Sequence, residues 1–338
     1  MDSSEDRILL AHGSGGELSH QLVSSLFAQS FHNPILQPLD DSAVISVEGE
    51  RWAFTTDSYV VTPIFFPGGD IGKLAVCGTV NDLAMSGAQS LFLSAGFIIE
   101  EGFLFSDLKR IVQSMQKTAA EAGVQIVTGD TKVVNRGAAD RVFINTAGIG
   151  RIPPGILISG HNARPGDKVL ISGTMGDHEV AILSAREGLE FSTALVSDCA
   201  PLNQLVKKLV TLSPQIHSLR DPTRGGLSST LNELARQSGV GIWVEENRIP
   251  VKEEVRGACE LLGFEPWNLA NEGKLVAIVA AEAAEAILRG MKDHPLGRDA
   301  AMIGEVKEDP PGKVILRTPI GSTRLLDMMV GEPLPRIC

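Results

Sequence analysis

Residues 55–88, TTDSYVVTPIFFPGGDIGKLAVCGTVNDLAMSGA, decide the fold of the first half of the chain. A β-branched run predicts a strand over residues 52–56, and apolar residues at helical spacing predict a helix over residues 71–86. Asp57 follows the predicted strand, and Asp82 lies in the sequence TVNDLAM. The stretch therefore predicts an α/β domain that presents carboxylates at the ends of its elements.

The segments on either side continue this alternation. Downstream, a second helix is expected over residues 107–122, because Ser106 is a good N-cap and Gly123 a good stop. Upstream, residues 18–27 have apolar side chains at helical spacing and follow the glycine-rich segment His12-Gly13-Ser14-Gly15-Gly16. β-branched runs predict further strands over residues 43–47, 125–128 and 142–147.

Proline and glycine interrupt the chain near its middle, so we place a domain boundary between residues 151 and 166. The expected segments are 1–35 (glycine-rich), 36–152 (first domain), 153–330 (C-terminal α/β domain) and 331–338 (mobile tail). In the second domain we expect strands over residues 168–172, 242–245 and 275–280, and helices over residues 178–187, 201–212, 227–237, 252–262 and 284–291.

Composition and charge exclude several classes of protein. The formal net charge of -11 and the lack of a basic block disfavour nucleic acid as a partner. No apolar run reaches the length of a membrane span, and the N-terminus lacks the basic-then-apolar pattern of a signal peptide. We therefore expect no membrane partner and a cytoplasmic location.

The four cysteines lie far apart without a C-x-x-C pair, which disfavours a zinc knuckle and a disulfide framework. Cys77 and Cys259 are expected in the core. Cys338 ends a proline-punctuated segment that neither continues a helix nor joins a central strand, so its thiol is expected to be exposed and mobile. Residues 330–338 can extend roughly 30 Å, enough to carry that thiol between an internal cleft and a partner.

Acidic residues recur where apolar segments meet small-residue loops, at Asp40-Asp41, Asp57, Asp82 and Asp130. Converging carboxylates repel one another unless a cation lies between them, and Mg²⁺ bridges one or two carboxylates to substrate phosphates. Each aspartate alone is explained equally well as a turn or cap residue. The four together favour a magnesium–nucleotide site.

Two glycine-rich segments offer backbone amides to phosphate. Residues 221–226, DPTRGG, precede a predicted helix whose N-terminus favours an anion, although Arg224 in this turn can simply pair with a carboxylate. Residues 12–16 can fold over a triphosphate, although a flexible N-terminal loop explains them as well. Neither G-x-x-x-x-G-K-[ST] nor G-x-G-x-x-G occurs, so any nucleotide is held in some other way.

Lys132, which follows Asp130, and Glu272, in the polar turn over residues 269–273, are candidates for proton transfer if they are partly desolvated. Most lysines and glutamates are solvated surface residues, so residue type alone does not decide. His178 begins a predicted helix, where a histidine is usually structural.

Motifs spread from His12 to Cys338 resemble the HypE family of hydrogenase maturation proteins: HGSGG, DDSA, the block over residues 55–88, TGDTKVV, DPTRGGL, NEGK and the final PRIC. The block and the terminal cysteine separate this family from its relatives in the aminoimidazole ribonucleotide synthetase and selenophosphate synthetase superfamily. Glu179 departs from the pattern, in which a small residue follows Gly176-Asp177-His178, and this allows a local change in helix packing or site shape.

The resemblance implies a two-domain PurM-like α/β fold. In it the N-terminal sheet forms a shared barrel in a homodimer, and ATP binds in the cleft between the domains. The implied catalytic residues are Cys338, Lys132 and Glu272, the last two as bases. The implied Mg²⁺ ligands are Asp41, Asp57, Asp82 and Asp130, and the implied nucleotide-binding residues are His12, Gly13, Gly15, Gly16, Asn81, Asp221, Gly225 and Gly226.

By the same resemblance, the carbamoyltransferase HypF loads a carbamoyl group onto Cys338, and ATP activates the carbamoyl oxygen. Phosphorylation turns this oxygen into a good leaving group. The resulting thiocyanate then passes to an iron-carrying HypC–HypD complex and becomes a cyanide ligand of nickel–iron hydrogenase. The expected activity is that of an ATP-dependent carbamoyl dehydratase, a lyase.

Two other functions fit parts of the sequence. A small-molecule kinase of the same superfamily, of the selenophosphate or thiamine-phosphate type, fits the aspartates but leaves Cys338 unexplained. A non-catalytic scaffold that binds nucleotide to regulate assembly would use the tail as a docking peptide. Turnover of ATP that depends on a carbamoylated tail distinguishes the dehydratase from both.

Overall fold

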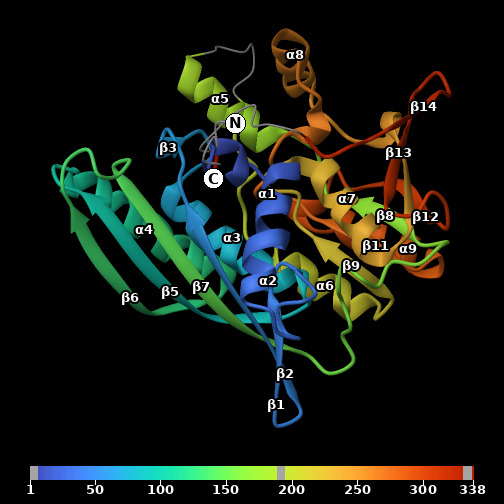
Figure 1. Cartoon of the computed structure of the whole chain (residues 1–338), viewed down its shortest axis with the longest axis horizontal. Coiled ribbons are helices and arrows are strands. Elements are labelled where there is room, and N and C mark those ends of the chain that lie inside the picture. Colours follow the sequence, from blue (N-terminus) through green and yellow to red (C-terminus); the bar gives the residue numbers. More distant parts are fainter. Residues whose placement is uncertain (1–6, 189–194, 330–336) are drawn as a thin grey trace, which may run out of the picture.

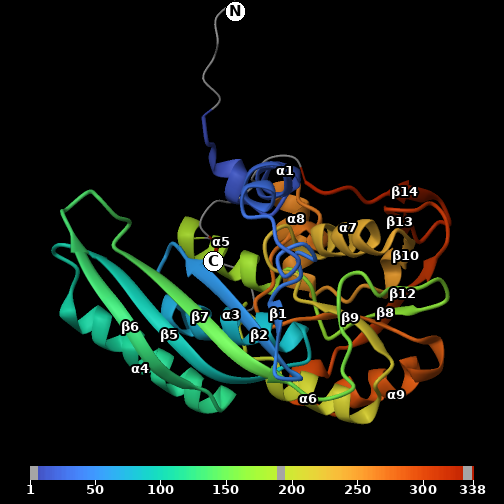
Figure 2. The same cartoon turned by 60° about the horizontal axis from the view of Figure 1, so that its bottom comes forward.

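The computed structural model describes residues 7–188, 195–329 and 337–338. Two sheets lie side by side, one from each half of the chain, and the C-terminus lies between them near α5 (Asp177–Glu187) (Figure 1, Figure 2). The helix predicted over residues 18–27 is present but interrupted by one wide turn. This N-terminal segment consists of η1 (Leu10–Gly13), α1 (Glu17–Leu22), η2 (Val23–Phe27) and α2 (Ala28–Ser30).

The first sheet has five strands in the order β1-β2-β7-β5-β6. β5 and β6 are parallel, and the other neighbours are antiparallel. The strands are β1 (Ala43–Val47), β2 (Glu50–Tyr59), β5 (Gln89–Glu100), β6 (Gln125–Val134) and β7 (Val142–Ile152), and β3 (Phe65–Phe66) and β4 (Gly69–Asp70) form a separate short hairpin.

Helices α3 (Ile71–Met85) and α4 (Phe105–Ala122) cover one face of this sheet (Figure 2). Asp70 caps α3 by accepting hydrogen bonds from the backbone amides of Gly72 and Lys73. The prediction that Ser106 caps α4 is wrong, because Leu104 already takes the extended N-cap conformation and the helix begins at Phe105. Gly123, with φ of 72°, ends α4 as predicted.

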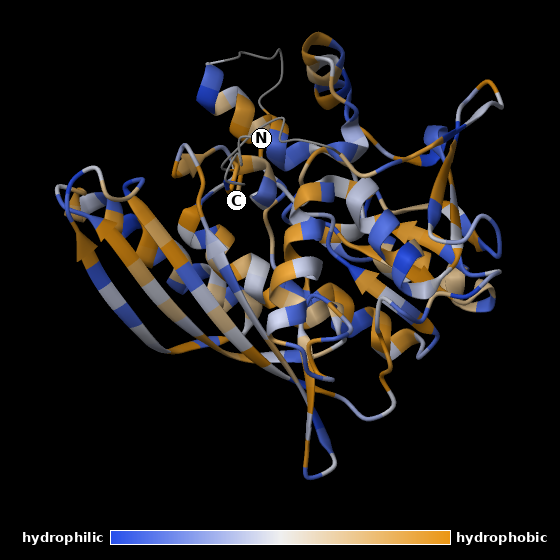
Figure 3. Cartoon of the chain, in the orientation of Figure 1, coloured by the Kyte–Doolittle hydropathy of each residue, from blue (hydrophilic) through white to orange (hydrophobic). Residues whose placement is uncertain are grey.

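The opposite face of the first sheet is not covered by these helices. Successive strand residues alternate between the two faces, and Figure 3 shows apolar residues recurring along the strands. Phe54, Phe92, Ile98 and Ile149 lie on the open face with exposed fractions from 37% to 46%. The sheet therefore presents an apolar face that nothing in the described residues covers.

The second sheet has seven strands in the order β14-β13-β10-β12-β8-β11-β9. Within the described part of this second sheet, only the β10–β13 pair is parallel. The strands are β8 (Lys168–Ile171), β9 (Ile216–Arg220), β10 (Gly241–Glu245), β11 (Val276–Val279), β12 (Ala301–Lys307), β13 (Lys313–Arg317) and β14 (Thr323–Leu325).

Helices cover both faces of the second sheet. Leu170 of β8 packs towards α6 (Asn203–Leu212) and α9 (Ala281–Lys292), whereas its neighbours Val169 and Ile171 pack towards α7 (Gly226–Ser238). None of the described helices is long and apolar enough to cross a membrane. The remaining elements are α8 (Glu253–Leu262), which packs on α5, and the single turns η3 (Glu246–Arg248), η4 (Pro266–Asn268) and η5 (Pro295–Gly297).

The two halves share one apolar cluster. It joins Leu83 and Met85 of α3 to Leu205 and Leu209 of α6 and to Ile287 of α9. These side chains are at most 3% exposed. The walls of the cleft between the sheets therefore belong to one packed body.

Candidate active site

A small acidic pocket lies where the two halves meet. Its volume is about 190 Å³, and β2, α3, the turn before α7 and the turn before β11 form its walls. The last residue of the chain completes it. The pocket is lined by Asp41, Thr55, Thr56, Asp57, Ser58, Tyr59, Gly78, Asp82, Asp221, Thr223, Arg224, Glu272 and Cys338.

Three of the four predicted metal ligands, Asp41, Asp57 and Asp82, line this pocket. Asp57 lies within β2 and Asp82 within α3, so the prediction that these carboxylates stand at element ends is wrong. They meet because α3 packs across the inner face of β2, where Thr55 Oγ1 donates to Asp82 Oδ2 at 2.9 Å.

The pocket holds more negative charge than its hydrogen bonds satisfy. Burial raises the pKa of Asp82, and the neighbouring Asp221, Asp57 and Asp41 raise it further. Burial also raises the pKa of Asp221, whose Oδ2 accepts no hydrogen bond from any described residue. A cation or the donor groups of a ligand would relieve this repulsion.

Arg220 neutralises one corner of the pocket. Its Nε lies 3.0 Å from Asp41 Oδ1, and its Nη2 lies 3.1 Å from Glu233 Oε2. Burial is nevertheless the larger effect on Asp41 and raises its pKa to about 6. Asp41 is therefore held beside a permanent cation and is still easier to protonate than a solvated aspartate.

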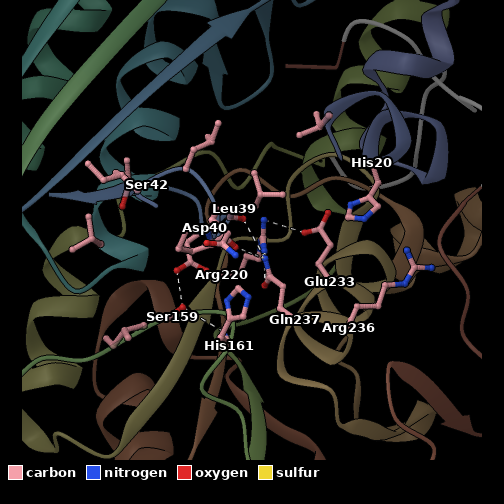
Figure 4. Close-up of a pocket in the computed structure, with 18 of the residues that line it drawn as sticks. His20, Leu39, Asp40, Ser42, Ser159, His161, Arg220, Glu233, Arg236 and Gln237 are labelled. Carbon is pink, nitrogen blue, oxygen red and sulfur yellow. Dashed lines mark hydrogen bonds and ion pairs between the residues drawn. The ribbon is translucent and has the colours of Figure 1, made fainter. Parts of the chain in front are cut away.

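Arg220 also borders a second, larger cavity of about 740 Å³ beside α1. Figure 4 shows Arg220 and Glu233 pointing toward one another in its wall. Asp40 turns into this cavity, and its carboxylate accepts hydrogen bonds from Ser159 and Gly160. Asp41 thus lines the acidic pocket and Asp40 the larger cavity, and the Asp40 carboxylate is hydrogen-bonded by its neighbours.

Cys338 is half-buried at the acidic pocket, so the prediction of an exposed thiol is wrong for this conformation. The physical reason is its neighbour Ile337, whose apolar side chain is 5% exposed in the core of the first domain. Burial raises the pKa of the Cys338 thiol, Glu272 raises it further, and the Arg224 guanidinium opposes both. Cys338 and Glu272 line the same pocket.

Glu272 is buried in the turn before β11, with an exposed fraction of 3%. Burial raises its pKa, and Cys199 and Asp221 are the next largest causes. Its backbone amide donates to Asp198 Oδ1 at 3.0 Å, and Asp198 Oδ2 lies 3.0 Å from Lys274 Nζ. A carboxyl with a raised pKa, held rigidly beside a thiol, is suited to proton transfer.

Asn81, a predicted nucleotide ligand, does not line the pocket. Its Nδ2 donates to the carbonyls of Ala200 and Glu272, at 3.2 Å and 3.3 Å, and its Oδ1 accepts from the Leu202 amide at 2.7 Å. The side-chain amide of Asn81 is thus hydrogen-bonded to the backbone of Glu272 and of the adjacent segment at residues 200–202. Its position suits it to holding that turn.

The two glycine-rich segments contact one another beside the pocket. Arg224 Nη1 donates to the Gly13 carbonyl at 3.3 Å, and a Cβ on Gly15 would lie 2.5 Å from the Arg224 carbonyl oxygen. Gly225 is left-handed, with φ of 78°, and α7 begins at Gly226, one residue before the predicted start at residue 227. Gly16 caps α1, whereas His12 accepts a local hydrogen bond from Leu9.

Asp130 and Lys132 lie outside this pocket in the single chain. They stand on the edge strand β6, where Lys132 Nζ lies 2.6 Å from Asp130 Oδ2 and the two side chains are 67% and 71% exposed. This ion pair lowers the pKa of Asp130. Because β6 pairs with β5 at Asp130–Gly96 and Lys132–Ile98, both side chains lie on the same open face as Ile98.

Arg224, Tyr59 and Asp198 are the main site residues that the sequence does not identify. Arg224 appears in the sequence only as a turn residue, yet it faces Cys338, Asp57 and Glu272. The DPTRGG motif indicates a phosphate-binding turn, but an Arg224 that only pairs with a carboxylate explains the arginine equally well. Nothing in the sequence around Asp198 connects it to Glu272.

No three His, Cys, Asp or Glu side chains in the described ranges form a ready metal cage. Mg²⁺ does not require one, because it usually keeps several waters and is held by one or two carboxylates together with substrate phosphates. The unsatisfied Asp221 oxygen and the raised pKa values of Asp82 and Asp41 suit such a cation. The donor set fits Mg²⁺ bound together with a nucleotide.

The chain has a two-domain fold with an acidic pocket between its two sheets. Comparison with known families assigns both domains to the AIR synthase related proteins. Residues 39–152 match the family model of the AIR synthase related protein N-terminal domain, and residues 164–317 match that of the C-terminal domain. The matched segments cover most of the chain.

Full-length relatives narrow this class. The chain is 56% identical to carbamoyl dehydratase HypE of Cupriavidus necator over 98% of its own length and 95% of the relative. A crystal structure of a HypE–HypF complex matches with a TM-score of 0.87 and 53% identity over 91% of this chain and 99% of that one. A crystal structure of HypE in complex with ATP matches with a TM-score of 0.83 and 54% identity over 98% of this chain and 100% of that one. The chain belongs to the HypE family of carbamoyl dehydratases.

Proposed function

We propose that this carbamoyl dehydratase uses ATP to dehydrate an S-carbamoyl group on its own Cys338 and so forms a thiocyanate for hydrogenase maturation. One observation carries the proposal: Cys338 lines the acidic pocket together with Glu272, whose carboxyl is among the groups that raise the pKa of the thiol. A group attached to this sulfur would lie among the carboxylates. A kinase for a free small molecule would need that space for its substrate, which disfavours the kinase alternative.

The chemistry balances in two steps. The carbamoyl oxygen attacks the γ-phosphorus of ATP, the bond from that phosphorus to the bridging oxygen breaks, and ADP leaves. The carbamoyl nitrogen then loses its protons, the carbon–oxygen bond breaks with release of phosphate, and a carbon–nitrogen triple bond remains on sulfur. The protein's part is to position the carbamoyl group and to accept protons from nitrogen.

Glu272 is our candidate for the base in the second step. It is buried next to the sulfur, and its Oε1 accepts no hydrogen bond from the described residues. Its raised pKa makes the carboxylate a stronger base than a solvated glutamate. Arg224, which lines the same pocket as Cys338, is suited to hold negative charge that develops on the carbamoyl oxygen or the phosphate.

Mg²⁺ would be held by Asp57, Asp82 and Asp221, with Asp41 at the corner occupied by Arg220. When bound, it would offset the charge of the nucleotide phosphates. The pocket volume of about 190 Å³ is below the roughly 300–1,000 Å³ of a site that encloses a whole ligand of nucleotide size. It fits the reacting end of the nucleotide, and the glycine-rich segments at its rim are placed to cover phosphates.

We further propose a homodimer that forms through the open face of the first sheet, as a shared barrel. The apolar side chains Phe54, Phe92, Ile98 and Ile149 on that face support it, since nothing described in the chain covers them. In such a dimer Asp130 and Lys132, which share this face, would lie against the partner chain. They would then act as metal ligand and base in the partner's pocket and not in the pocket of their own chain.

The partners we propose follow from the family. HypF would load the carbamoyl group, and an iron-carrying HypC–HypD complex would receive the cyanide. Both exchanges need Cys338 to leave the pocket, because its thiol is half-buried there.

The test follows the mass of the C-terminal peptide. The full-length protein is carbamoylated by HypF, separated from it, and given Mg-ATP. The proposal expects the peptide containing Cys338 to lose one water only when ATP is present, with one phosphate released per water. An unchanged adduct, or an adduct on another cysteine, would contradict it.

A further inference from the structure

His178, at the start of α5, has no exposed surface and uses both ring nitrogens. Its Nδ1 lies 2.7 Å from Ser197 Oγ, and its Nε2 lies 3.0 Å from the carbonyl oxygen of Ile337. Phe66 packs edge-on against the ring, with centroids 5.6 Å apart. A histidine far from the end of the chain in sequence thus bonds to the peptide group next to Cys338.

The surrounding hydrogen bonds decide which nitrogen carries the proton. The Cys199 amide donates to Ser197 Oγ at 3.0 Å, which leaves the serine hydroxyl hydrogen to donate to Nδ1. A carbonyl can only accept, so Nε2 must carry a hydrogen and donate it to Ile337. Burial lowers the pKa of His178, which favours this neutral form.

The side chain of Ile337 provides a second anchor. It belongs to the same apolar cluster as Phe66, Cys199 and Ala270 and is 5% exposed. The backbone and the side chain of one residue are therefore both held. The next residue, Cys338, shares the acidic pocket with Glu272.

One short segment connects this anchor to the candidate base. Ser197 bonds to His178, while the adjacent Asp198 accepts from the Glu272 amide and pairs with Lys274. The arm and the base are thus positioned by neighbouring residues of the same segment. A displacement of the C-terminal arm would therefore also displace Glu272.

We propose that His178 is a positioning residue that docks the C-terminal arm, by donating from Nε2 to the Ile337 carbonyl and so fixing the group on Cys338 against Glu272. His178 does not line the acidic pocket itself. Because the contact is to backbone and the neighbouring pocket is apolar, the site takes a chain end with an aliphatic residue before the cysteine. Only the expected effect of His178 on water loss rests on the proposed function, because docking of the arm does not require turnover.

The test measures how fast iodoacetamide alkylates Cys338 in the full-length protein, by mass spectrometry of its peptides. His178→Leu fills the space but cannot donate. Loss of a hydrogen bond of ordinary net strength predicts alkylation about three- to tenfold faster than in the wild type. His178→Gln keeps an amide donor and is expected to stay closer to the wild type than to the leucine variant. His161→Leu, at an exposed histidine, is the matched control and should not change the rate.

Alkylation of the buried Cys77, Cys199 and Cys259 reports whether each variant is folded. If the leucine variant exposes them, Ser197→Ala replaces it, because it removes the partner that fixes the ring proton and is expected to raise Cys338 alkylation about twofold. Equal rates in wild type and in the folded variants would overturn the proposal. So would a glutamine variant as fast as the leucine variant.

A second readout separates docking from the dehydratase proposal. In a single turnover of carbamoylated protein, His178→Leu is expected to lower the rate of water loss by the same factor while the KM for ATP stays unchanged. If no variant, including wild type, loses water, the proposed function fails and the alkylation result still decides on the arm. A rise in the ATP KM with unchanged water loss would contradict the positioning role.

Discussion

Asp130 and Glu272 are acidic residues that the sequence assigned to one site, yet they lie in opposite surroundings. Asp130 is on an edge strand, and its ion pair with Lys132 lowers its pKa. Glu272 is buried beside a thiol and other carboxylates, and these surroundings raise its pKa. A salt bridge in solvent contributes little, whereas an unsatisfied buried carboxyl is costly and therefore informative. The difference supports our proposals that the reaction takes place in the pocket and that the β6 pair serves a partner chain.

The largest expected effect comes from the buried member of this comparison. Glu272→Gln keeps the shape of the side chain but removes the base, so we expect single-turnover water loss to fall by about 10²- to 10⁴-fold. The wild-type rate should rise with pH through the raised pKa of Glu272, and the variant should lose that dependence. Glu265→Gln, at a glutamate paired with Arg324 outside the pocket, is the control. A variant that retains both rate and pH profile would show that another group is the base.

An intermediate effect tests whether the exposed pair serves a neighbouring site. Lys132→Ala and Glu272→Gln proteins are each expected to be inactive alone. If Lys132 acts across a homodimer, mixing them creates heterodimers with one intact site, and activity should return to about a quarter of the wild-type level. If Lys132 acts within its own chain, mixing restores nothing. Native mass spectrometry confirms that subunits have exchanged.

The smallest effect concerns stability. Asp82 and Asp221 have raised pKa values when folded, so above their ordinary range near 3.8 the folded state keeps protons that the unfolded chain has lost. More protons bound to the folded state means that stability falls as pH rises. The Mg²⁺ that we propose in this pocket would replace those protons, so its stabilisation, about 2.7 kcal/mol at a hundred times its Kd, should be larger at high pH than at low pH.

Thermal unfolding with and without Mg²⁺, at pH 5 and pH 8, measures this effect. Asp82→Asn should reduce the Mg²⁺-dependent rise in Tm, and Asp130→Asn should leave it unchanged when the protein is diluted until it is monomeric. The same rise at both pH values would argue against a cation among these carboxylates. If the Asp130 variant lost the Mg²⁺-dependent rise in Tm under these conditions, Asp130 would be a metal ligand within its own chain.

The sequence predicts much of the fold, because its helices carry clear periodicity and caps. It misses β5, whose sequence QSLFLSAGFIIE lacks strict alternation, and it misses β9 and the strands after residue 300. β5 lacks alternation because it carries apolar residues on both of its faces, the helix-covered face and the open face. Amphipathic patterning cannot identify a strand that is apolar on both faces.

The candidate site is predictable in residue type but not in arrangement. Asp57 and Asp82 were found, although they lie within elements and not at their ends. Asp198 and His178 were not assigned to the site, because each acts through a contact made across the fold: Asp198 with the Glu272 amide and His178 with the Ile337 carbonyl. Glu179, the departure from the family pattern, accepts a hydrogen bond from the Ala270 amide at 2.6 Å, in the turn that carries Glu272.

The apolar cluster that joins α3 to α6 and α9 has a consequence for folding. Separate domains unfold independently only when the surface between them is small or polar. Here Leu83 and Met85 of the first half are buried by Leu205, Leu209 and Ile287 of the second. Either half alone would expose these side chains to water. Although two family models divide the chain, heating should therefore melt it in a single cooperative transition.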